Sequence, residues 1–126
     1  MTYFKNNMAL KFGVKSAIVA EYLWDSLYVV QKTECAVTRQ QGKEWCRASV
    51  IHITSVFPFL SKHQVRDAID ILTENKVIQK GCFNCSRFDH TNWYCFTEYG
   101  KALMLQNEKF ALSEVYLKKR NLNDEQ

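Results

Sequence analysis

The chain has 126 residues, of which 47% are hydrophobic and 24% are charged. This length fits one domain of ordinary size, and this balance excludes an intrinsically disordered or a fibrous chain. Seventeen Lys and Arg against thirteen Asp and Glu give a formal charge of +4, which permits a phosphate-binding face without demanding one.

No apolar run approaches the roughly 20 residues that a membrane-spanning helix needs, and the N-terminus lacks the apolar core of a signal peptide. We therefore expect a cytoplasmic protein with no membrane partner. The five cysteines are an odd number, which argues against a disulfide framework in that compartment and leaves free thiols or metal ligands.

Apolar residues recur with helical spacing over residues 15–32, which predicts a first helix there. Residues 33–42 are mostly polar and predict a loop. In residues 43–48, Trp45 and Arg47 share one side of an alternating pattern, which predicts a short strand that pairs with a later hairpin.

Two more helices are expected on either side of Pro58, because proline removes a backbone donor and disfavours helical geometry at the preceding residue. Ser49 is the predicted N-cap of the first helix and Ser61 that of the second. Asn75 is the predicted C-terminal cap, since asparagine tolerates the left-handed conformation. The apolar stripe of the second helix is Val65, Ala68, Ile69 and Leu72.

Strand-favouring runs at 77–80 and 93–97 flank a polar loop, residues 81–92, and together predict a projecting hairpin. Residues 98–110 predict a last helix with inward anchors that include Leu103 and Phe110. Trp45, Trp93, Tyr94 and Phe96 are expected to be packing residues.

A short helix, a turn, a second helix and a hairpin in this order are typical of a winged helix-turn-helix. The expected fold class is therefore α+β and mostly α, with a short β-hairpin wing and additional N- and C-terminal helices. We expect residues 1–12 to form an N-terminal extension, 13–112 the winged-helix domain and 113–126 a polar C-terminal tail.

Several short motifs follow one another between residues 12 and 97. They are Gly13 before Ala17-Ile18-Val19, Trp45, Phe57-Pro58-Phe59-Leu60-Ser61, the helix end at Leu72, Glu74 and Lys76, and then Phe83-Asn84, Asp89, Thr91 and Trp93-Tyr94. In this order they resemble the N-terminal winged-helix domain of phage and prophage replication-initiation proteins, the replisome organizers. The most specific part is Phe83-Asn84 followed, after four residues, by Asp-x-Thr-x-Trp-Tyr.

The resemblance implies binding of double-stranded DNA in replication initiation of a phage, prophage or mobile element. It also implies primosome or helicase-loading proteins as partners, recruited by a further part that we expect to be absent or to lie beyond residue 126. The chain departs from the family in the wing, where Cys85 and His90 stand at points that often carry Lys or Arg.

In a helix-turn-helix, the N-terminal residues of the second helix lie nearest the base edges. The DNA-binding candidates are therefore Ser61, Lys62, His63, Gln64 and Arg66, joined from the wing by Lys80, Asn84, Ser86, Arg87 and His90. Carboxylates further along the helix, at Asp67, Asp70 and Glu74, restrict the contact to its first turns. The alternative is that Lys62, Arg66 and Asp70 form an i, i+4 charge ladder on a solvated face.

A zinc site is a second alternative for the wing, because Cys82, Cys85, His90 and Cys95 have the spacing of a zinc knuckle. Cys95 lies in a predicted strand, and no glycine stands between Cys85 and Cys95 to tighten the turn. We therefore expect neither metal nor cofactor. No nucleophile, acid/base pair or phosphate-binding glycine loop is recognisable, so we do not expect an enzyme.

Two other functions stay open, because one fold serves several roles. One is a transcriptional regulator. The other is a protein-interaction or dimerisation module without DNA binding, in which Tyr22, Trp24, Leu27 and Tyr28 of the first helix form an aromatic docking face, or the last helix docks.

Overall fold

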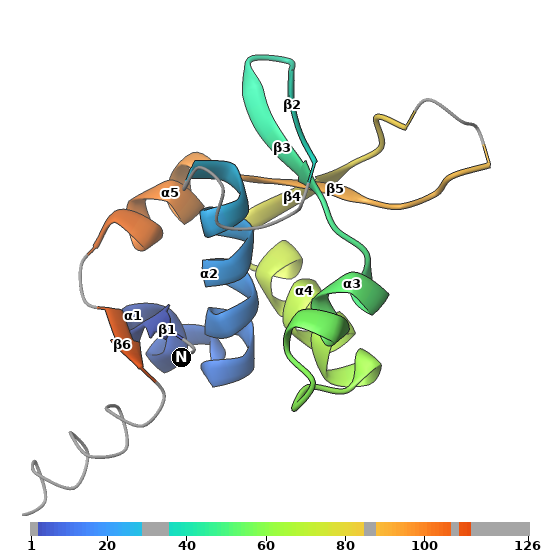
Figure 1. Cartoon of the computed structure of the whole chain (residues 1–126). Coiled ribbons are helices and arrows are strands. Elements are labelled where there is room, and N and C mark those ends of the chain that lie inside the picture. Colours follow the sequence, from blue (N-terminus) through green and yellow to red (C-terminus); the bar gives the residue numbers. More distant parts are fainter. Residues whose placement is uncertain (1–2, 29–35, 85–87, 107–108, 112–126) are drawn as a thin grey trace, which may run out of the picture.

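The computed structural model describes residues 3–28, 36–84, 88–106 and 109–111. Within them the fold is α+β, as expected, with five helices and a four-stranded antiparallel sheet (Figure 1). The helices are α1 (Asn6–Phe12), α2 (Val14–Tyr28), α3 (Val50–Val56), α4 (Lys62–Glu74) and α5 (Glu98–Leu105). No helix of the described part is long and apolar enough to span a bilayer.

The four-stranded sheet has the order β2-β3-β5-β4. Its strands are β2 (Val37–Gln40), β3 (Lys43–Arg47), β4 (Ile78–Gly81) and β5 (Trp93–Phe96). A separate two-stranded sheet pairs β1 (Tyr3–Lys5) with β6 (Lys109–Ala111). The strand predicted at residues 43–48 and the hairpin that follows the helices are therefore confirmed.

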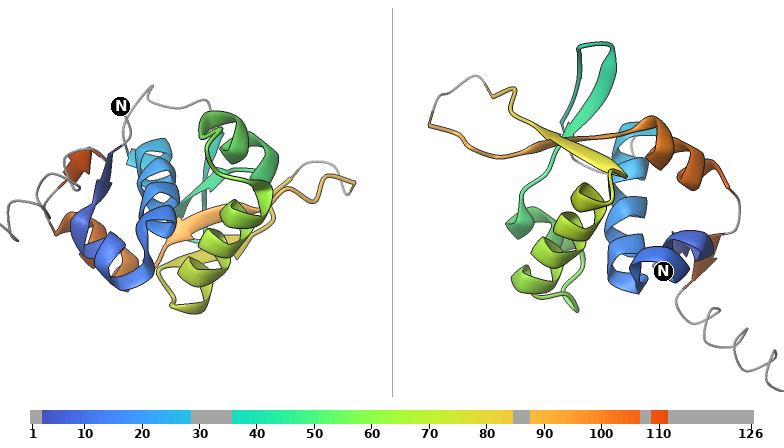
Figure 2. Two further views of the ribbon diagram at one scale, coloured as in Figure 1. Left: turned by 90° about the horizontal axis from the view of Figure 1, so that it is seen from below. Right: turned by 180° about the vertical axis from the view of Figure 1, so that it is seen from behind.

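Helix α2 lies in the middle of the molecule, with α1 and α5 on one side and α3 and α4 on the other (Figures 1 and 2). The core is continuous across it, from Phe4 and Met8 to Val65 and Leu72, which are all fully buried. Phe4 and Met8 come from the segment 3–12, which thus belongs to the same core as the remainder of the described chain.

Both predicted N-caps are confirmed. The Ser49 hydroxyl accepts a hydrogen bond from the backbone N–H of His52 at 3.0 Å. Ser61 and Gln64 form a reciprocal capping box, in which Ser61 Oγ accepts from the Gln64 N–H at 3.1 Å and Gln64 Oε1 accepts from the Ser61 N–H at 2.9 Å. The two helices on either side of Pro58 therefore begin where the sequence predicts.

The C-terminal end of α4 differs in detail from the prediction. Asn75 occupies the C-cap but has φ −86°, whereas the left-handed residue is Lys76, with φ 59°. The N–H of Val77 donates to the Leu72 carbonyl and that of Lys76 to the Thr73 carbonyl, at 2.9 and 3.1 Å. These two bonds define a Schellman motif, which places the left-handed residue one position after the cap.

Two other predictions were wrong. Residues 37–40, predicted as loop, form β2, which turns into β3 through Gln41 and Gly42 at φ 56° and 74°. The predicted last helix ends at Leu105 rather than at residue 110, because residues 109–111 pair with β1. Leu103 is a buried anchor, as expected, whereas Phe110 lies in β6.

Candidate nucleic-acid interface

The first turns of α4 carry three exposed basic residues, Lys62, His63 and Arg66. His63 Nε2 lies 3.3 Å from Asp67 Oδ2, whereas neither Lys62 nor Arg66 forms an ion pair with any described residue. The buried stripe on the opposite side of α4 holds the helix against α2, so these three side chains project from a fixed support.

Ser61 and Gln64 belong to the same turn but are engaged in the capping box described above. Reading an adenine edge with both ends of an amide requires Oε1 and Nε2 of the glutamine together. Gln64 Oε1 already accepts a hydrogen bond from the Ser61 N–H. We therefore infer that Ser61 and Gln64 stabilise the N-terminus of α4.

The later turns of α4 are acidic and exposed, with Asp67, Asp70 and Glu74. Asp70 Oδ1 lies 3.9 Å from Lys80 Nζ of β4, so one hairpin candidate faces the acidic part of α4. This surface therefore holds the ion pair Asp70–Lys80 and a close His63–Asp67 contact, which is an ion pair only when the imidazole is protonated, and the charge ladder through Lys62 and Arg66 does not form among the described side chains.

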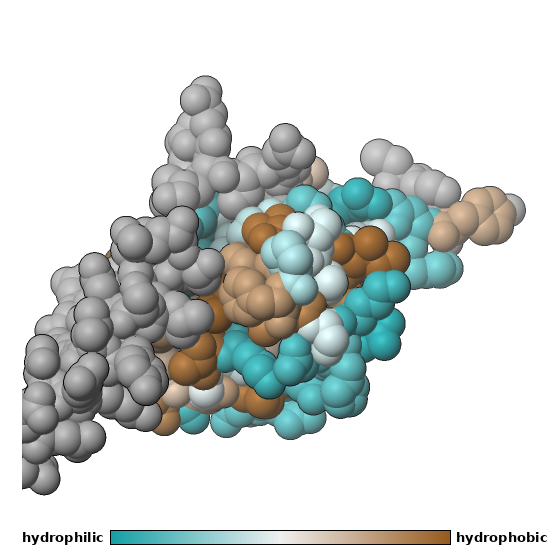
Figure 3. Space-filling view, turned by 60° about the horizontal axis from the view of Figure 1, so that its bottom comes forward, coloured by the Kyte–Doolittle hydropathy of each residue, from teal (hydrophilic) through white to brown (hydrophobic). Residues whose placement is uncertain are grey.

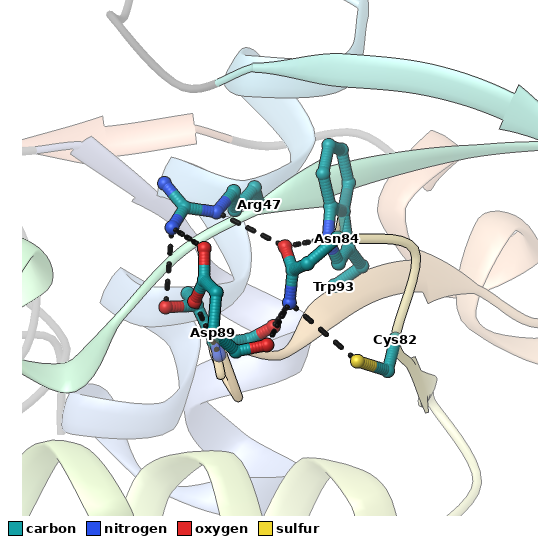
Figure 4. A network of polar contacts seen from close by, with 6 residues as sticks. Arg47, Cys82, Asn84, Asp89 and Trp93 are labelled. Atoms are coloured by element: carbon teal, nitrogen blue, oxygen red, sulfur yellow. Dashed lines mark hydrogen bonds and ion pairs between the residues drawn. The ribbon is translucent and has the colours of Figure 1, made fainter. Parts of the chain in front are cut away.

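Asn84 holds the two arms of the β4–β5 loop together (Figure 4). Its Nδ2 donates to the backbone carbonyls of Asp89 and Thr91, at 2.9 and 2.8 Å. Its Oδ1 accepts from Trp93 Nε1 at 2.8 Å. The amide of this DNA-binding candidate is thus occupied within the loop, where it sets the path of the chain.

Arg47 of β3 completes this network, a role that the sequence did not reveal. Its Nη2 lies 2.5 Å from Asp89 Oδ2 and 3.3 Å from Thr91 Oγ1, and its Nε lies 3.3 Å from Asn84 Oδ1. Asp89 Oδ1 also accepts from the Thr91 N–H at 3.0 Å. The hydrogen bonds from Thr91 and then the Arg47 guanidinium hold the pKa of Asp89 below its usual value.

An aromatic cluster fastens the start of the loop to the face of the sheet opposite the main core. The centroid of the Phe83 ring lies 5.0 Å from the ring centroid of Trp45 and 6.3 Å from that of Trp93. Gly81 permits this packing, because a Cβ there would lie 2.7 Å from the Phe83 ring and 2.9 Å from Trp45. The expectation that Trp45 and Trp93 are packing residues is confirmed.

The most specific part of the sequence resemblance therefore corresponds to one structural unit. Asn84 bonds to Asp89, Thr91 and Trp93, Arg47 bonds to Asn84, Asp89 and Thr91, and Phe83 joins the unit through its ring contact with Trp93. The exposed residues of the described part of the loop are Cys82, Phe88, His90 and Asn92. Ser86 and Arg87 lie outside the described residues.

The candidate zinc ligands do not form a metal-binding cluster among the described residues of the loop. Cys82 is exposed, whereas Cys95 is buried with its Sγ 3.5 Å from Gln79 Oε1, and Cys85 lies outside the described residues. Burial raises the pKa of the Cys95 thiol, which disfavours the thiolate that zinc binds. Within the described ranges, no group of three His, Cys, Asp or Glu side chains is placed to hold a metal ion.

A groove of about 880 Å³ lies where the C-terminal end of α4 meets β4 and the start of α5. Lys43, Lys76 and Lys80 line it, so the positive charge of this region is not confined to the predicted contact residues. Lys43 Nζ donates to Gln79 Oε1 at 2.8 Å.

Comparison with known proteins found no matching family model, no matching curated protein and no matching solved structure.

Proposed function

We propose that this chain binds double-stranded DNA as a winged helix and acts in replication initiation of a phage, prophage or mobile element. The observation that carries the proposal is the strand pairing around the helix pair α3–α4. Strand β3 precedes the two helices, and it pairs with β5 of the hairpin that follows them, with Cys46 opposite Tyr94. A helix-turn-helix that is closed by a sheet and extended by a hairpin loop has this arrangement.

The chemistry of α4 supports the same proposal. Lys62 and Arg66 present positive charges that no described carboxylate neutralises, and arginine and lysine supply most phosphate contacts and guanine contacts in such complexes. The acidic turns that follow keep the rest of the helix away from phosphates. From the hairpin, His90 and Lys80 are the described candidates, and Ser86 and Arg87 remain predictions.

The replication role rests on the sequence resemblance to replisome organizers, carried by Phe83-Asn84 and the Asp89-to-Tyr94 segment. The structure gives these residues a reason to occur together, because they build the loop scaffold. Recruitment of primosome or helicase-loading proteins is part of the same proposal.

The decisive test is a titration of labelled duplex DNA at several salt concentrations, read by fluorescence anisotropy. Lys62→Ala combined with Arg66→Ala should weaken binding at least about tenfold and reduce the log–log salt slope by roughly 1.8, about 0.9 for each lost phosphate contact. Lys11→Ala combined with Lys101→Ala removes the same charge from α1 and α5, on the other side of α2 (Figure 1). If both pairs leave affinity and slope unchanged, the start of α4 is not the DNA-binding face.

A protein-interaction module is the second candidate function. Of the expected docking face on α2, Tyr22 is buried and the Trp24 ring packs edge-on against Phe96 at 5.2 Å, whereas Tyr28 stays 38% exposed. More strongly exposed apolar side chains occur at Ile51 and Phe59, which are 67% and 55% exposed. Figure 3 shows hydrophobic patches among hydrophilic surface on the side of the molecule that is turned forward there.

This second candidate is separated from the first by sedimentation at several concentrations beside the DNA titration. A docking module that forms homodimers should self-associate, should lose that association in Ile51→Ser with Phe59→Ser, and should ignore DNA. A transcriptional regulator would bind duplex DNA as the first proposal states, and differs only in the genes that its sites control.

A further inference from the structure

Basic side chains from separate elements line the groove at the C-terminal end of α4. Lys43 comes from β3, Lys76 from the turn after α4 and Lys80 from β4. Lys80 Nζ lies 3.9 Å from the Asp70 carboxylate, and Lys43 Nζ donates to the neutral amide of Gln79. Neither Lys43 nor Lys76 forms an ion pair with a described carboxylate. The groove therefore presents at least two positive charges that are available to a ligand.

Negative charge in the groove is small. Glu98 is the one carboxylate among the residues that line it, and its Oε1 lies 3.6 Å from Lys101 Nζ. With three lysines and one glutamate in the lining, the groove is positive overall. A ligand that follows it gains from carrying negative charges of its own.

An aromatic side chain borders the same groove. Tyr99, near the start of α5, lines it and is 48% exposed. The Tyr99 side chain makes no ring contact and no hydrogen bond with any described residue. Beside it the wall of the groove is fixed, because Trp45 is only 4% exposed and its Nε1 donates to the Gln40 carbonyl at 3.1 Å. An open aromatic ring and unpaired cations therefore occur together on a firm support.

The groove is separate from the candidate duplex-binding face. Helix α4 has 13 residues and is therefore about 20 Å long, with Lys62 at its first residue and Lys76 just beyond its end. The exposed carboxylates Asp67, Asp70 and Glu74 lie between these two positions. They would repel a phosphate backbone that ran from one basic surface to the other.

We infer that this groove binds single-stranded nucleic acid, with phosphates on Lys43 and Lys76 and a base stacked on Tyr99. Proteins that hold unpaired strands combine a positive groove with aromatic side chains on which bases stack. Lysine contacts a phosphate as a point charge, whereas recognition of a carboxylate in a fixed geometry favours arginine, which is absent from the lining. A flexible strand can enter a groove that excludes a rigid duplex. Beside the proposed duplex contact of α4, the groove would let one chain hold a duplex and an unpaired strand.

The test is an anisotropy titration of the full chain with a labelled oligothymidylate, which forms no duplex, at several salt concentrations. Lys43→Gln combined with Lys76→Gln should weaken binding roughly tenfold and reduce the log–log salt slope by about 1.4, or about 0.7 for each phosphate contact. Tyr99→Ala should weaken binding by about tenfold with an unchanged salt slope, because stacking is lost and no phosphate contact is. Tyr99→Phe should bind as the native chain does, since it keeps the ring.

Two variants serve as matched controls, and both should leave oligothymidylate binding unchanged. Lys62→Ala combined with Arg66→Ala removes the same charge from the other end of α4. Phe59→Ala removes a ring of similar exposure, 55%, from the turn before α4.

Three results would overturn the inference. One is a native chain that does not bind the oligothymidylate, whereas the proposed function is judged by the duplex titration alone. Another is an equal loss of duplex and single-strand affinity in the Lys43 and Lys76 variant, which would assign the groove to the duplex site. The third is displacement of the oligothymidylate by polyglutamate together with native binding by Tyr99→Ala, which would assign the groove to an acidic protein segment.

Discussion

Replacing Asn84 with alanine should unfold the loop scaffold at a measurable cost in stability. The Trp93 indole N–H would lose its acceptor at 2.8 Å while the ring stays 7% exposed, and an unsatisfied buried donor costs about 1–3 kcal/mol. The Asp89 and Thr91 carbonyls would each lose a hydrogen bond worth roughly 0.5–1 kcal/mol, since water can replace part of it. Together these terms give a loss of about 3 kcal/mol.

Urea unfolding followed by tryptophan fluorescence measures this loss, because Trp93 is itself part of the network. A loss of that size corresponds to a fall of about 10 °C in the melting temperature of a domain of this length. Asn92→Ala is the matched control in the same loop, because the exposed Asn92 side chain makes only a long contact, 3.5 Å to the Tyr94 hydroxyl. The reasoning fails if Asn84→Ala and Asn92→Ala unfold at the same urea concentration.

Three further changes test other parts of the fold. Gly100→Ala should destabilise the chain by at least about 3 kcal/mol in urea unfolding, because the new Cβ would lie 2.1 Å from the Val77 carbonyl oxygen; native-like stability would show that α5 can shift. Lys76→Gly should stabilise by about 0.5 kcal/mol, since glycine adopts φ 59° without strain, and a lower urea midpoint would contradict this. The lowered pKa of Asp89 should stabilise the fold above its ordinary pKa of about 4 and lose this contribution as the pH falls through the lower, folded value. Stability measured from about pH 5 downward should therefore fall more steeply in the native chain than in Asp89→Asn, and parallel curves would refute the assignment.

Local signals in the sequence were sufficient for the helices that carry the candidate site. The polar caps Ser49 and Ser61, the helix-breaking Pro58 and the apolar stripe of α4 act within a few residues of one another. Their consequences are therefore the same in most tertiary contexts. The exposure of the basic residues at the start of α4 follows directly from that stripe, because a helix that buries one face against the core exposes its other face to solvent.

Structural features that depend on partners far away in the sequence could not be predicted from the sequence. Strand β2 is exposed along most of its length and turns through Gln41-Gly42, whose first residue is not among the strong hairpin formers. Residues 109–111 have a helical composition, and only their pairing with β1, more than a hundred residues earlier, makes them a strand. Arg47 was read as a strand residue, since its partner Asp89 follows 42 residues later.

The structure changes the meaning of the motif that carries the sequence resemblance. Within this motif the Trp93 indole N–H donates to the Asn84 side-chain oxygen. These motif residues therefore stabilise the structure of the loop. The proposed DNA contacts of α4, Lys62 and Arg66, lie outside the motif. Scaffold and contact roles therefore separate by experiment: Asn84→Ala should lower both stability and DNA affinity, whereas Lys62→Ala combined with Arg66→Ala should lower affinity and leave the urea midpoint nearly unchanged, because both side chains are exposed and substitutions at such positions change stability little.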